Sequence, residues 1–242
     1  MNHGNVIVRF DNVSYAYVHG KNLLEEASFS VRENAKITIM GQNGAGKSTL
    51  FGLITGLLKV DEGDINIQPR TTIAVSRQII PRPELELTVR AFFEQCFKEK
   101  TYDIDPRIDE VLEIVNLVPT EKMKESFKER IIGSFSGGQQ ARLLLAQALI
   151  QNPDVLLLDE PTNFIDIDAL LWLEEYLSNE WKWGFLIISH DRTFLDVTTT
   201  ETLVVNEYSQ IVFSKIILVF LWILYARINM CILCFPCLSN LK

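Results

Sequence analysis

Residues 41–48 read GQNGAGKS and constrain this chain more than any other stretch. They complete the pattern G-x-x-x-x-G-K-[ST], and they stand between the strand-like run Lys36–Met40 and the helix-like run STLFGLITGLL. In this context the glycines let successive backbone N–H groups turn toward phosphate oxygens, and the helix N-terminus adds its positive dipole end. The sequence therefore predicts a phosphate-binding loop, with a glycine turn that binds nothing as the alternative. The predicted binding residues are Gly41, Gln42, Asn43, Gly44, Ala45, Gly46, Lys47, Ser48 and Thr49.

A second apolar run ends in two adjacent carboxylates. Val155–Pro161 reads VLLLDEP, which delivers both acids to the C-terminal end of a predicted strand, where ligands bind in open α/β sheets. We expect Lys47 to reach the β- and γ-phosphates of a nucleotide and Ser48 to ligate Mg²⁺ through its hydroxyl. Asp159 is the expected carboxylate on the Mg²⁺ side, and Glu160 is the candidate base for an attacking water. The alternative is a solvated acidic turn, which the phosphate loop upstream disfavours.

The apolar pattern predicts an α/β core. Runs of four apolar residues, such as VLLL and FLII, are typical of parallel strands buried on both faces. After the glycines, one broad apolar face of a helix is predicted from Leu50, Phe51, Leu53, Ile54, Leu57 and Leu58. The other predicted strands are Val6–Phe10, Ser28–Val31, Lys36–Met40, 65–67, 72–75 and 202–205, and a second helix is predicted around Ala169–Leu177.

Residues 79–150 differ from both flanks because they form charged, helix-like segments. Asp105 and Pro106 predict a helix start, with Asp105 as the cap and Pro106 at the first helical position. Apolar residues then recur at i, i+3, i+4 and i+7, namely Ile108, Val111, Leu112 and Val115. The sequence therefore predicts a helical subdomain inserted into one α/β core.

Ser134–Arg142 reads SFSGGQQAR and resembles the signature motif of ATP-binding cassette proteins. With the phosphate loop and the VLLLDEP strand, the resemblance extends over roughly Val6–Val205. It implies a P-loop nucleotide-binding domain over 1–208, with an antiparallel β layer near the N-terminus and an inserted helical subdomain. It also implies ATP and Mg²⁺ as ligands, and a second cassette as partner. The residues that would face ATP held by that partner are Ser136, Gly137, Gly138 and Gln139.

The smaller motifs of the family can be matched one by one. Tyr17 resembles the aromatic residue on which adenine stacks, although Tyr15 would lie on the same face of a strand and remains an alternative. Gln78 resembles the Q-loop glutamine that contacts Mg²⁺ and water, and His190 the switch histidine that contacts the γ-phosphate. Asp166 matches the D-loop aspartate at the dimer interface. The alternatives are an exposed amide for Gln78, a structural histidine, and a solvated carboxylate for Asp166.

The strings TNFID and SHDRTFLD look like the ABC-F subfamily, whose members carry two cassettes in one chain and act on ribosomes. We therefore favour a ribosomal role over the energising subunit of a membrane permease. Three features depart from the subfamily. The chain holds one cassette and so reads as a fragment or half-protein, or as a cassette that pairs with another copy; it lacks a long charged helical arm; and Phe164 and Ile165 replace the usual His and Leu.

The segment 209–242 does not continue the family pattern. Ile216–Ala226 is a run of 11 apolar residues, and the longer stretch to residue 238 is interrupted by Arg227, Asn229 and Pro236. A membrane span needs about 20 predominantly apolar residues. Four interpretations stay open: a tail anchor, a buried or partner-binding segment, a mistranslated or misassembled end, and a C-x-x-C-x-x-C metal site, which lacks a fourth ligand.

Charge, cysteine content and the N-terminal sequence indicate which ligands and which cell compartment to expect. The formal net charge of -8 gives no support to general attraction for nucleic acid, although a local basic patch could still bind RNA phosphates. The 4 cysteines show no paired framework, which fits a reducing compartment. The N-terminus lacks a basic start followed by an apolar stretch, so we expect a cytoplasmic protein without a secretory signal.

Overall fold

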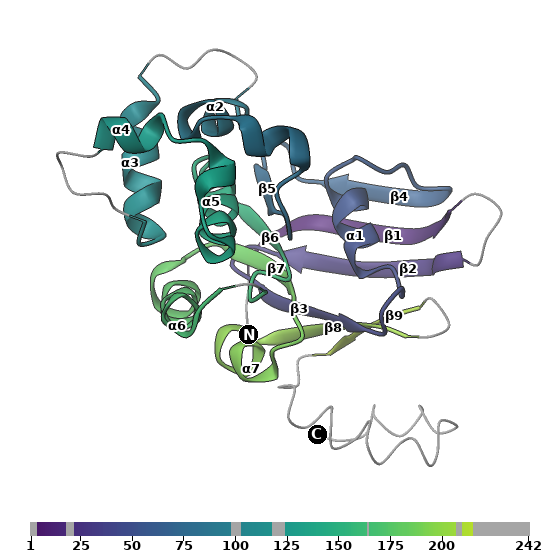
Figure 1. The fold of residues 1–242 in the computed structure, drawn as a ribbon. Helices are drawn as coiled ribbons and strands as arrows, with labels where there is room; N and C mark the ends of the chain where they lie inside the picture. Colours follow the sequence, from purple (N-terminus) through teal and green to yellow (C-terminus); the bar gives the residue numbers. More distant parts are fainter. Residues whose placement is uncertain are drawn as a thin grey trace.

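The computed structural model describes residues 4–17, 22–97, 103–117, 124–163, 165–206 and 210–214. These ranges form a three-stranded antiparallel sheet, ordered β2-β1-β4, and a six-stranded sheet, ordered β5-β6-β7-β3-β8-β9 (Figure 1). The predicted fold class, an α/β domain with an antiparallel layer, is confirmed. The strands are β1 (Val6–Ala16), β2 (Asn22–Arg32), β3 (Lys36–Gly41), β4 (Glu62–Ile67), β5 (Ile73–Ser76), β6 (Val155–Asp159), β7 (Gly184–Ile188), β8 (Glu201–Val205) and β9 (Ile211–Ser214).

The larger sheet is parallel from β5 to β8, and its central strands are buried on both faces. Successive residues of β6 contribute to different cores. Leu156 and Leu158 pack into the core that includes the helical region, whereas Val155 and Leu157 pack into the core shared with the antiparallel sheet. An uninterrupted apolar run is what a strand between two cores requires.

Helix α1 (Lys47–Ile54) follows the phosphate loop and is shorter than its apolar pattern predicts. Thr55 is its C-cap, and Gly56 adopts a left-handed φ of 73°, the conformation that commonly ends a helix. Leu50 and Ile54 are buried, but Leu57 lies beyond the turn and is 82% exposed. The expectation that Leu57 lies on the apolar face is therefore wrong, because the helix has already ended.

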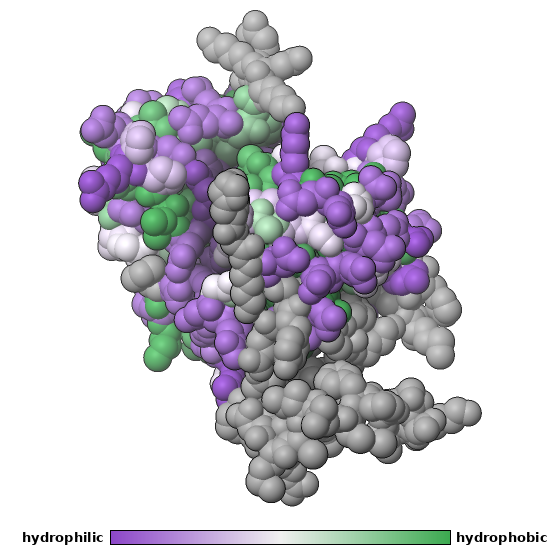
Figure 2. Space-filling view, turned by 90° about the vertical axis from the view of Figure 1, so that its right-hand side faces the viewer, coloured by the Kyte–Doolittle hydropathy of each residue, from purple (hydrophilic) through white to green (hydrophobic). Residues whose placement is uncertain are grey.

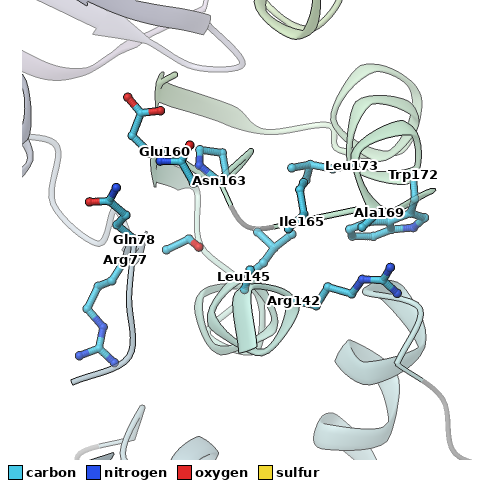
Figure 3. Close-up of a pocket in the computed structure, with 13 residues that line it drawn as sticks. Arg77, Gln78, Arg142, Leu145, Glu160, Asn163, Ile165, Ala169, Trp172 and Leu173 are labelled. Atoms are coloured by element: carbon cyan, nitrogen blue, oxygen red, sulfur yellow. The ribbon is translucent and has the colours of Figure 1, made fainter. Parts of the chain in front are cut away.

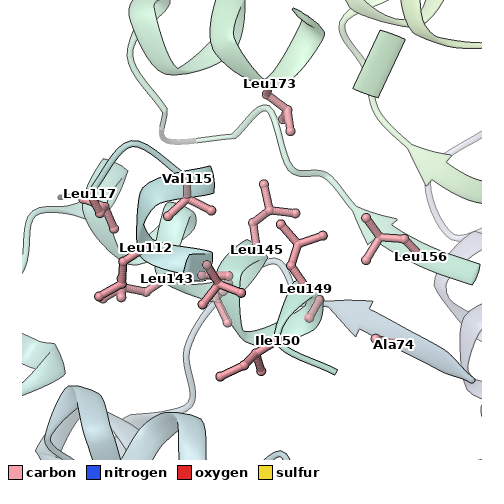
Figure 4. Packing of buried hydrophobic residues seen from close by; sticks show 14 of the residues in the cluster. Ala74, Leu112, Val115, Leu117, Leu143, Leu145, Leu149, Ile150, Leu156 and Leu173 are labelled. Atoms are coloured by element: carbon pink, nitrogen blue, oxygen red, sulfur yellow. The ribbon is translucent and has the colours of Figure 1, made fainter. Parts of the chain in front are cut away.

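The residues between β5 and β6 form a helical region, whose apolar side chains share one core with residues of the larger sheet and of α6 (Figure 4). Ile108, Val111, Leu112 and Val115 are all buried there, as their spacing predicts. The third helix begins one residue before the predicted position, at Asp105, whose carboxylate lies 3.1 Å from Arg90. The helical elements are η1 (Arg82–Glu86), α2 (Val89–Glu94), α3 (Asp105–Ile114), α4 (Lys124–Lys128), η3 (Ile132–Ser134) and α5 (Gly137–Leu149).

Three further helical segments, α6 (Ile167–Glu175), the π-helix η4 (Tyr176–Glu180) and α7 (Arg192–Thr198), complete the core. The sheet continues past residue 208, because β9 pairs antiparallel with β8. Residues 215–242, with the apolar run and the three clustered cysteines, lie outside the described residues. None of the helices in the described ranges has the length and apolar character that a membrane crossing requires. Figure 2 shows one face of the molecule, where hydrophilic side chains predominate among the coloured residues.

Candidate functional site

The phosphate loop connects the C-terminal end of β3 to the N-terminus of α1. Gly44 and Gly46 take left-handed φ values of 82° and 91°, which side chains rarely adopt, and Gly46 is the N-cap of α1. The Lys47 ammonium donates to the carbonyl oxygens of Gly41 at 2.9 Å and Gln42 at 3.0 Å. The lysine therefore lies folded over the loop, with its charge held by groups that a phosphate can replace.

Two carboxylates lie at the end of β6, next to this loop. The Asp159 carboxylate accepts a hydrogen bond from the Ser48 hydroxyl. Glu160 has a left-handed φ of 50°, unusual for a side-chain-bearing residue, and its backbone N–H donates to Ile188 at 2.8 Å. His190 Nε2 lies 3.2 Å from Glu160 Oε1. Strained backbone at such a position is typical of functional sites.

Burial sets the electrostatics of both acids. It raises the pKa of Asp159, and the Ser48 hydrogen bond and the Lys47 charge offset part of the shift. It also raises the pKa of Glu160, against the opposing effect of His190. Glu160 Oε2 is buried without a hydrogen-bond partner among the described residues. A desolvated carboxylate with a free oxygen is suited to accept a hydrogen bond from water.

One open cavity of about 610 Å³ joins these elements, within the range of small-molecule sites. It brings together the residue after β1, a residue of β2, the phosphate loop, the Q-loop and the ends of β6 and β7. The sequence-predicted residues that line it are Tyr17, Asn43, Gly44, Gly46, Lys47, Ser48, Thr49, Gln78, Asp159, Glu160 and His190. Gly41, Gln42 and Ala45 belong to the loop but not to the lining.

The two tyrosines differ in exposure. Tyr17 follows the end of β1, is 54% exposed and lines the cavity. Tyr15 lies within the strand, is 8% exposed and belongs to the apolar core. Their rings meet edge to face, with centroids 5.3 Å apart. The structure therefore places the Tyr17 ring where a flat ligand could stack on it, with the buried Tyr15 ring packed edge to face against Tyr17.

The signature residues lie outside this cavity, at the start of α5. Ser136 caps the helix by accepting from the Gln139 N–H at 3.3 Å, and Gln139 Oε1 accepts from the Ser136 N–H at 3.1 Å. This reciprocal capping box leaves Ser136 and Gly137 exposed. A Cβ built on Gly137 meets no described atom within 4 Å. The helix start is therefore formed, but no described residue of this chain covers it.

Asp166 also lies outside the cavity. It is the N-cap of α6, accepting from the Ala169 N–H at 2.8 Å, and its carboxylate lies 3.1 Å from Arg142 of α5. Arg142 reaches the Asn116 carbonyl as well, at 3.1 Å. Within this chain Asp166 thus connects α5 to α6.

Three cavity residues were missed from the sequence, namely Leu23, Asn163 and Ile188, the last residue of β7. Asn163 follows Glu160 by three positions in the DEPTN string, and its place after the acidic pair could have indicated it. Leu23 contacts the loop from β2, where its Cβ would lie 3.4 Å from a Cβ on Gly46. Its role depends on how the two sheets pack, which no local signal in the sequence reveals.

The donor set suits Mg²⁺. The Ser48 hydroxyl and the Asp159 carboxylate are hard oxygen donors already in contact, and Gln78 adds an amide oxygen on the same cavity wall. Two protein ligands are enough for this ion when substrate phosphates and water complete its shell. The residues present therefore fit the predicted ion.

Comparisons with known proteins place the chain in a family. A family model described as ABC transporter matches residues 24–163. ABC transporter F family member 5 of Arabidopsis thaliana is 31% identical, over 86% of this chain and 36% of that protein. The zinc import ATP-binding protein ZnuC of Buchnera aphidicola subsp. Schizaphis graminum is 32% identical, over 84% of this chain and 82% of that protein. The dimeric ATP-binding cassette MJ0796 bound to ADP and Pi has a TM-score of 0.70 at 23% identity, over 86% of this chain and 98% of that one.

The extent of these matches decides what they show. The chain spans only 29% to 37% of the length of several curated relatives, including Uup and ABC transporter F proteins. The family model nevertheless covers more than half of the 242 residues, and the ZnuC match covers most of both chains. The chain therefore belongs to the ABC transporter family, as an ATP-binding cassette of the ATPase class that binds ATP with Mg²⁺.

Proposed function

We propose that this cassette hydrolyses ATP at an interface with a second cassette and acts on ribosomes in the cytosol, as ABC-F proteins do. One observation carries the catalytic part. Lys47, Asp159, Glu160 and His190 line a single cavity, whereas the signature serine, Ser136, is exposed at the start of α5 and is not part of the lining. Such a chain has a nucleotide cradle but needs another molecule's signature face to enclose the γ-phosphate.

The roles of the cavity residues follow from their contacts. Lys47 exchanges the carbonyl oxygens of Gly41 and Gln42 for β- and γ-phosphate oxygens. Mg²⁺, held by Ser48, Asp159 and Gln78, supplies positive charge to the phosphates when bound.

The water-activating group is Glu160, whose free oxygen Oε2 orients the attacking water and accepts its proton. His190 Nε2 lies 3.2 Å from the other carboxylate oxygen. We expect it to contact the γ-phosphate when a second cassette encloses the nucleotide. Positioning and charge neutralisation then provide most of the catalysis.

Two kinds of partner remain in competition. The ABC-F interpretation rests on the TNFID and SHDRTFLD strings and on the Arabidopsis thaliana relative. A transporter subunit is the second candidate, because this chain covers 82% of ZnuC, a zinc import ATP-binding protein, but only 36% of the ABC-F relative. Phe164, which departs from the ABC-F pattern, lies outside the described residues.

Substitution of Glu160 tests the catalytic role. We expect Glu160→Gln to bind Mg·ATP as tightly as the parent but to hydrolyse it about 10²- to 10⁴-fold more slowly, the usual contribution of a general base. Phosphate release and nucleotide binding are measured on the same preparations. Glu175→Gln, an exposed change on α6, is the matched control and keeps the parental rate. Parental turnover in Glu160→Gln would remove the assigned role.

The Glu160→Gln variant also separates the two partner classes, because it holds the ATP-bound state. In the presence of Mg·ATP, we expect it to co-sediment with ribosomes and to be released when ATP is omitted. Co-purification with an integral membrane permease, without ribosomes, would contradict the ABC-F role and favour the transporter subunit.

A further inference from the structure

Arg77 lies beside the nucleotide cavity but has no part in the roles assigned above. It is the residue directly after β5 and directly before Gln78. Its guanidinium makes two parallel hydrogen bonds to Glu84 of η1, Nη1 to Oε1 at 2.8 Å and Nη2 to Oε2 at 2.6 Å. Bidentate pairs of this kind fix both direction and distance. Figure 3 shows that the Arg77 and Gln78 side chains extend to opposite sides of the backbone.

The pair closes the loop that carries Gln78. Residues 78–83 lie between Arg77 and Glu84, so the ion pair fastens the two ends of this Q-loop segment together. Ile80 in the segment is buried, whereas Gln78 itself is exposed and Ile79 is 66% exposed. This Arg77–Glu84 ion pair, called the clamp below, therefore restrains a segment whose first two residues, Gln78 and Ile79, are exposed.

A third group joins the pair to the helical region. Arg77 Nη2 also donates to Gln147 Oε1 of α5 at 3.0 Å, and Gln147 Nε2 donates to the Phe92 carbonyl of α2 at 3.2 Å. The surroundings are partly desolvated, since burial raises the pKa of the neighbouring Cys96 to about 12. Charge-assisted hydrogen bonds are stronger in such surroundings than at an open surface.

We propose that Arg77 is a positioning residue that holds Gln78 at the Mg²⁺ side of the cavity through its clamp on Glu84 and Gln147. The inference rests on the proposed function, because it gives Gln78 a partner in the Mg·ATP complex. Arg77 and Gln78 are consecutive, so the bonds that hold the Arg77 side chain also restrain the backbone from which the Gln78 side chain extends toward the cavity. Gln147 lies on α5, the helix that starts with the signature serine, so the clamp also ties Gln78 to that helix.

The test measures how much Mg²⁺ strengthens nucleotide binding. Affinity for a fluorescent ATP analogue is determined on the full chain with Mg²⁺ and with EDTA, for the parent, Arg77→Met, Gln78→Ala and the double variant. We expect Arg77→Met to keep the EDTA affinity within about twofold and to lose about tenfold of the Mg²⁺-dependent gain. Gln78→Ala should lose a similar factor, and the double variant no more than either single one, because both changes remove the same contact.

Controls separate the clamp from a general loss of structure. Arg82→Met and Glu86→Gln alter exposed charges at the two ends of η1 and should keep the full Mg²⁺ gain. Exchange of the pair, Arg77→Glu with Glu84→Arg, should recover most of the gain that Arg77→Met loses. If Arg77→Met proves unstable, this exchanged pair and Arg77→Lys, which cannot bind bidentately, carry the test.

Three outcomes overturn the proposal: a parental Mg²⁺ gain in Arg77→Met, fully multiplicative losses in the double variant, or no recovery in the exchanged pair. If the parent binds the analogue equally well with Mg²⁺ and with EDTA, then Gln78 does not contribute to Mg²⁺ binding and the proposed role of the clamp is wrong. A parent that binds no nucleotide under either condition contradicts instead the proposed function itself.

Discussion

Two helix starts in the described part of the chain carry motifs suited to bind phosphate, and they differ in how far other residues enclose them. The start of α1 is enclosed by Leu23 from β2, by the folded Lys47 and by the acids at the end of β6, which together form the large cavity. The start of α5 is exposed, and its capping box occupies the N–H groups of Ser136 and Gln139. The start of α1 therefore lies in a formed cavity, whereas no described residue of this chain covers the start of α5.

This difference supports the proposal that one chain forms only part of the active site. A helix N-terminus attracts anions through its free N–H groups and its dipole, but an exposed one binds weakly because water competes. The α1 site overcomes this with a lysine and a desolvated wall. The α5 site has no such wall among the described residues. We therefore infer that a second cassette covers this helix start and presents the γ-phosphate of its own bound ATP to it.

Gly137→Ala tests whether a second molecule covers the start of α5. A methyl group at this position meets nothing within 4 Å among the described residues, so the single chain should keep or slightly gain stability, by about 0.4 to 1 kcal/mol. Against a closely apposed partner the same methyl would overpack by about 1 to 3 kcal/mol, which corresponds to about 5- to 150-fold slower hydrolysis. Thermal unfolding and phosphate release measure the two effects separately. Unchanged hydrolysis would show that no partner approaches this face.

Asp166 provides a second test near the α5 site, because its carboxylate already contacts Ala169 and Arg142 within this chain. Asp166→Ala removes the cap of α6 and the contact with Arg142, and should lower the free energy of unfolding by about 1 kcal/mol. Asp166→Asn keeps the cap and should cost less, since an exposed ion pair contributes little. Denaturant titrations provide the measurement. Equal losses in both variants would assign the effect to charge rather than to capping.

A smaller effect concerns the desolvated acid in the α1 cradle. Burial raises the pKa of Glu160 above the ordinary 4.5, so the folded chain holds this proton more firmly than the unfolded chain. Stability from this group is then fully present below pH 4.5 and is lost as the pH rises through the raised value. Glu160→Gln should therefore be more stable than the parent at pH 8, with the gain vanishing near pH 4.

Unfolding of Glu160→Gln and of the exposed control Glu175→Gln, followed at both pH values, tests this expectation. A constant difference between Glu160→Gln and the parent at pH 4 and pH 8 would contradict the desolvation of the acid. A matching pH dependence in Glu175→Gln would assign the effect to overall charge.

Local patterns explain why much of the fold could be predicted. The phosphate loop is contiguous, and the strands buried on both faces show as apolar runs, so β3, β6 and β7 were recognisable from sequence alone. Helix ends were less certain, as the early stop of α1 before Leu57 shows, because a left-handed glycine outweighed a continuing apolar pattern.

Contacts between distant segments could not be predicted. Lys128 is 2% exposed and pairs with Asp109 at 3.0 Å, although a charged residue in a charged segment gives no sign of burial. The bond from Arg142 to Asp166 and the clamp of Arg77 on Glu84 likewise depend on packing. The choice between Tyr15 and Tyr17 needed the end of β1, which a period of two does not reveal.

Titration of the full chain with Mg·ATP in a calorimeter tests the central claim most directly. One ATP should bind per chain, and Lys47→Ala should lose about 100-fold or more in affinity, because charged hydrogen bonds to the phosphates disappear. Lys59→Ala, an exposed change after the loop, should bind as the parent does. A chain that takes up no Mg·ATP, or a Lys47→Ala variant that takes it up equally well, would contradict a nucleotide cradle built by the start of α1.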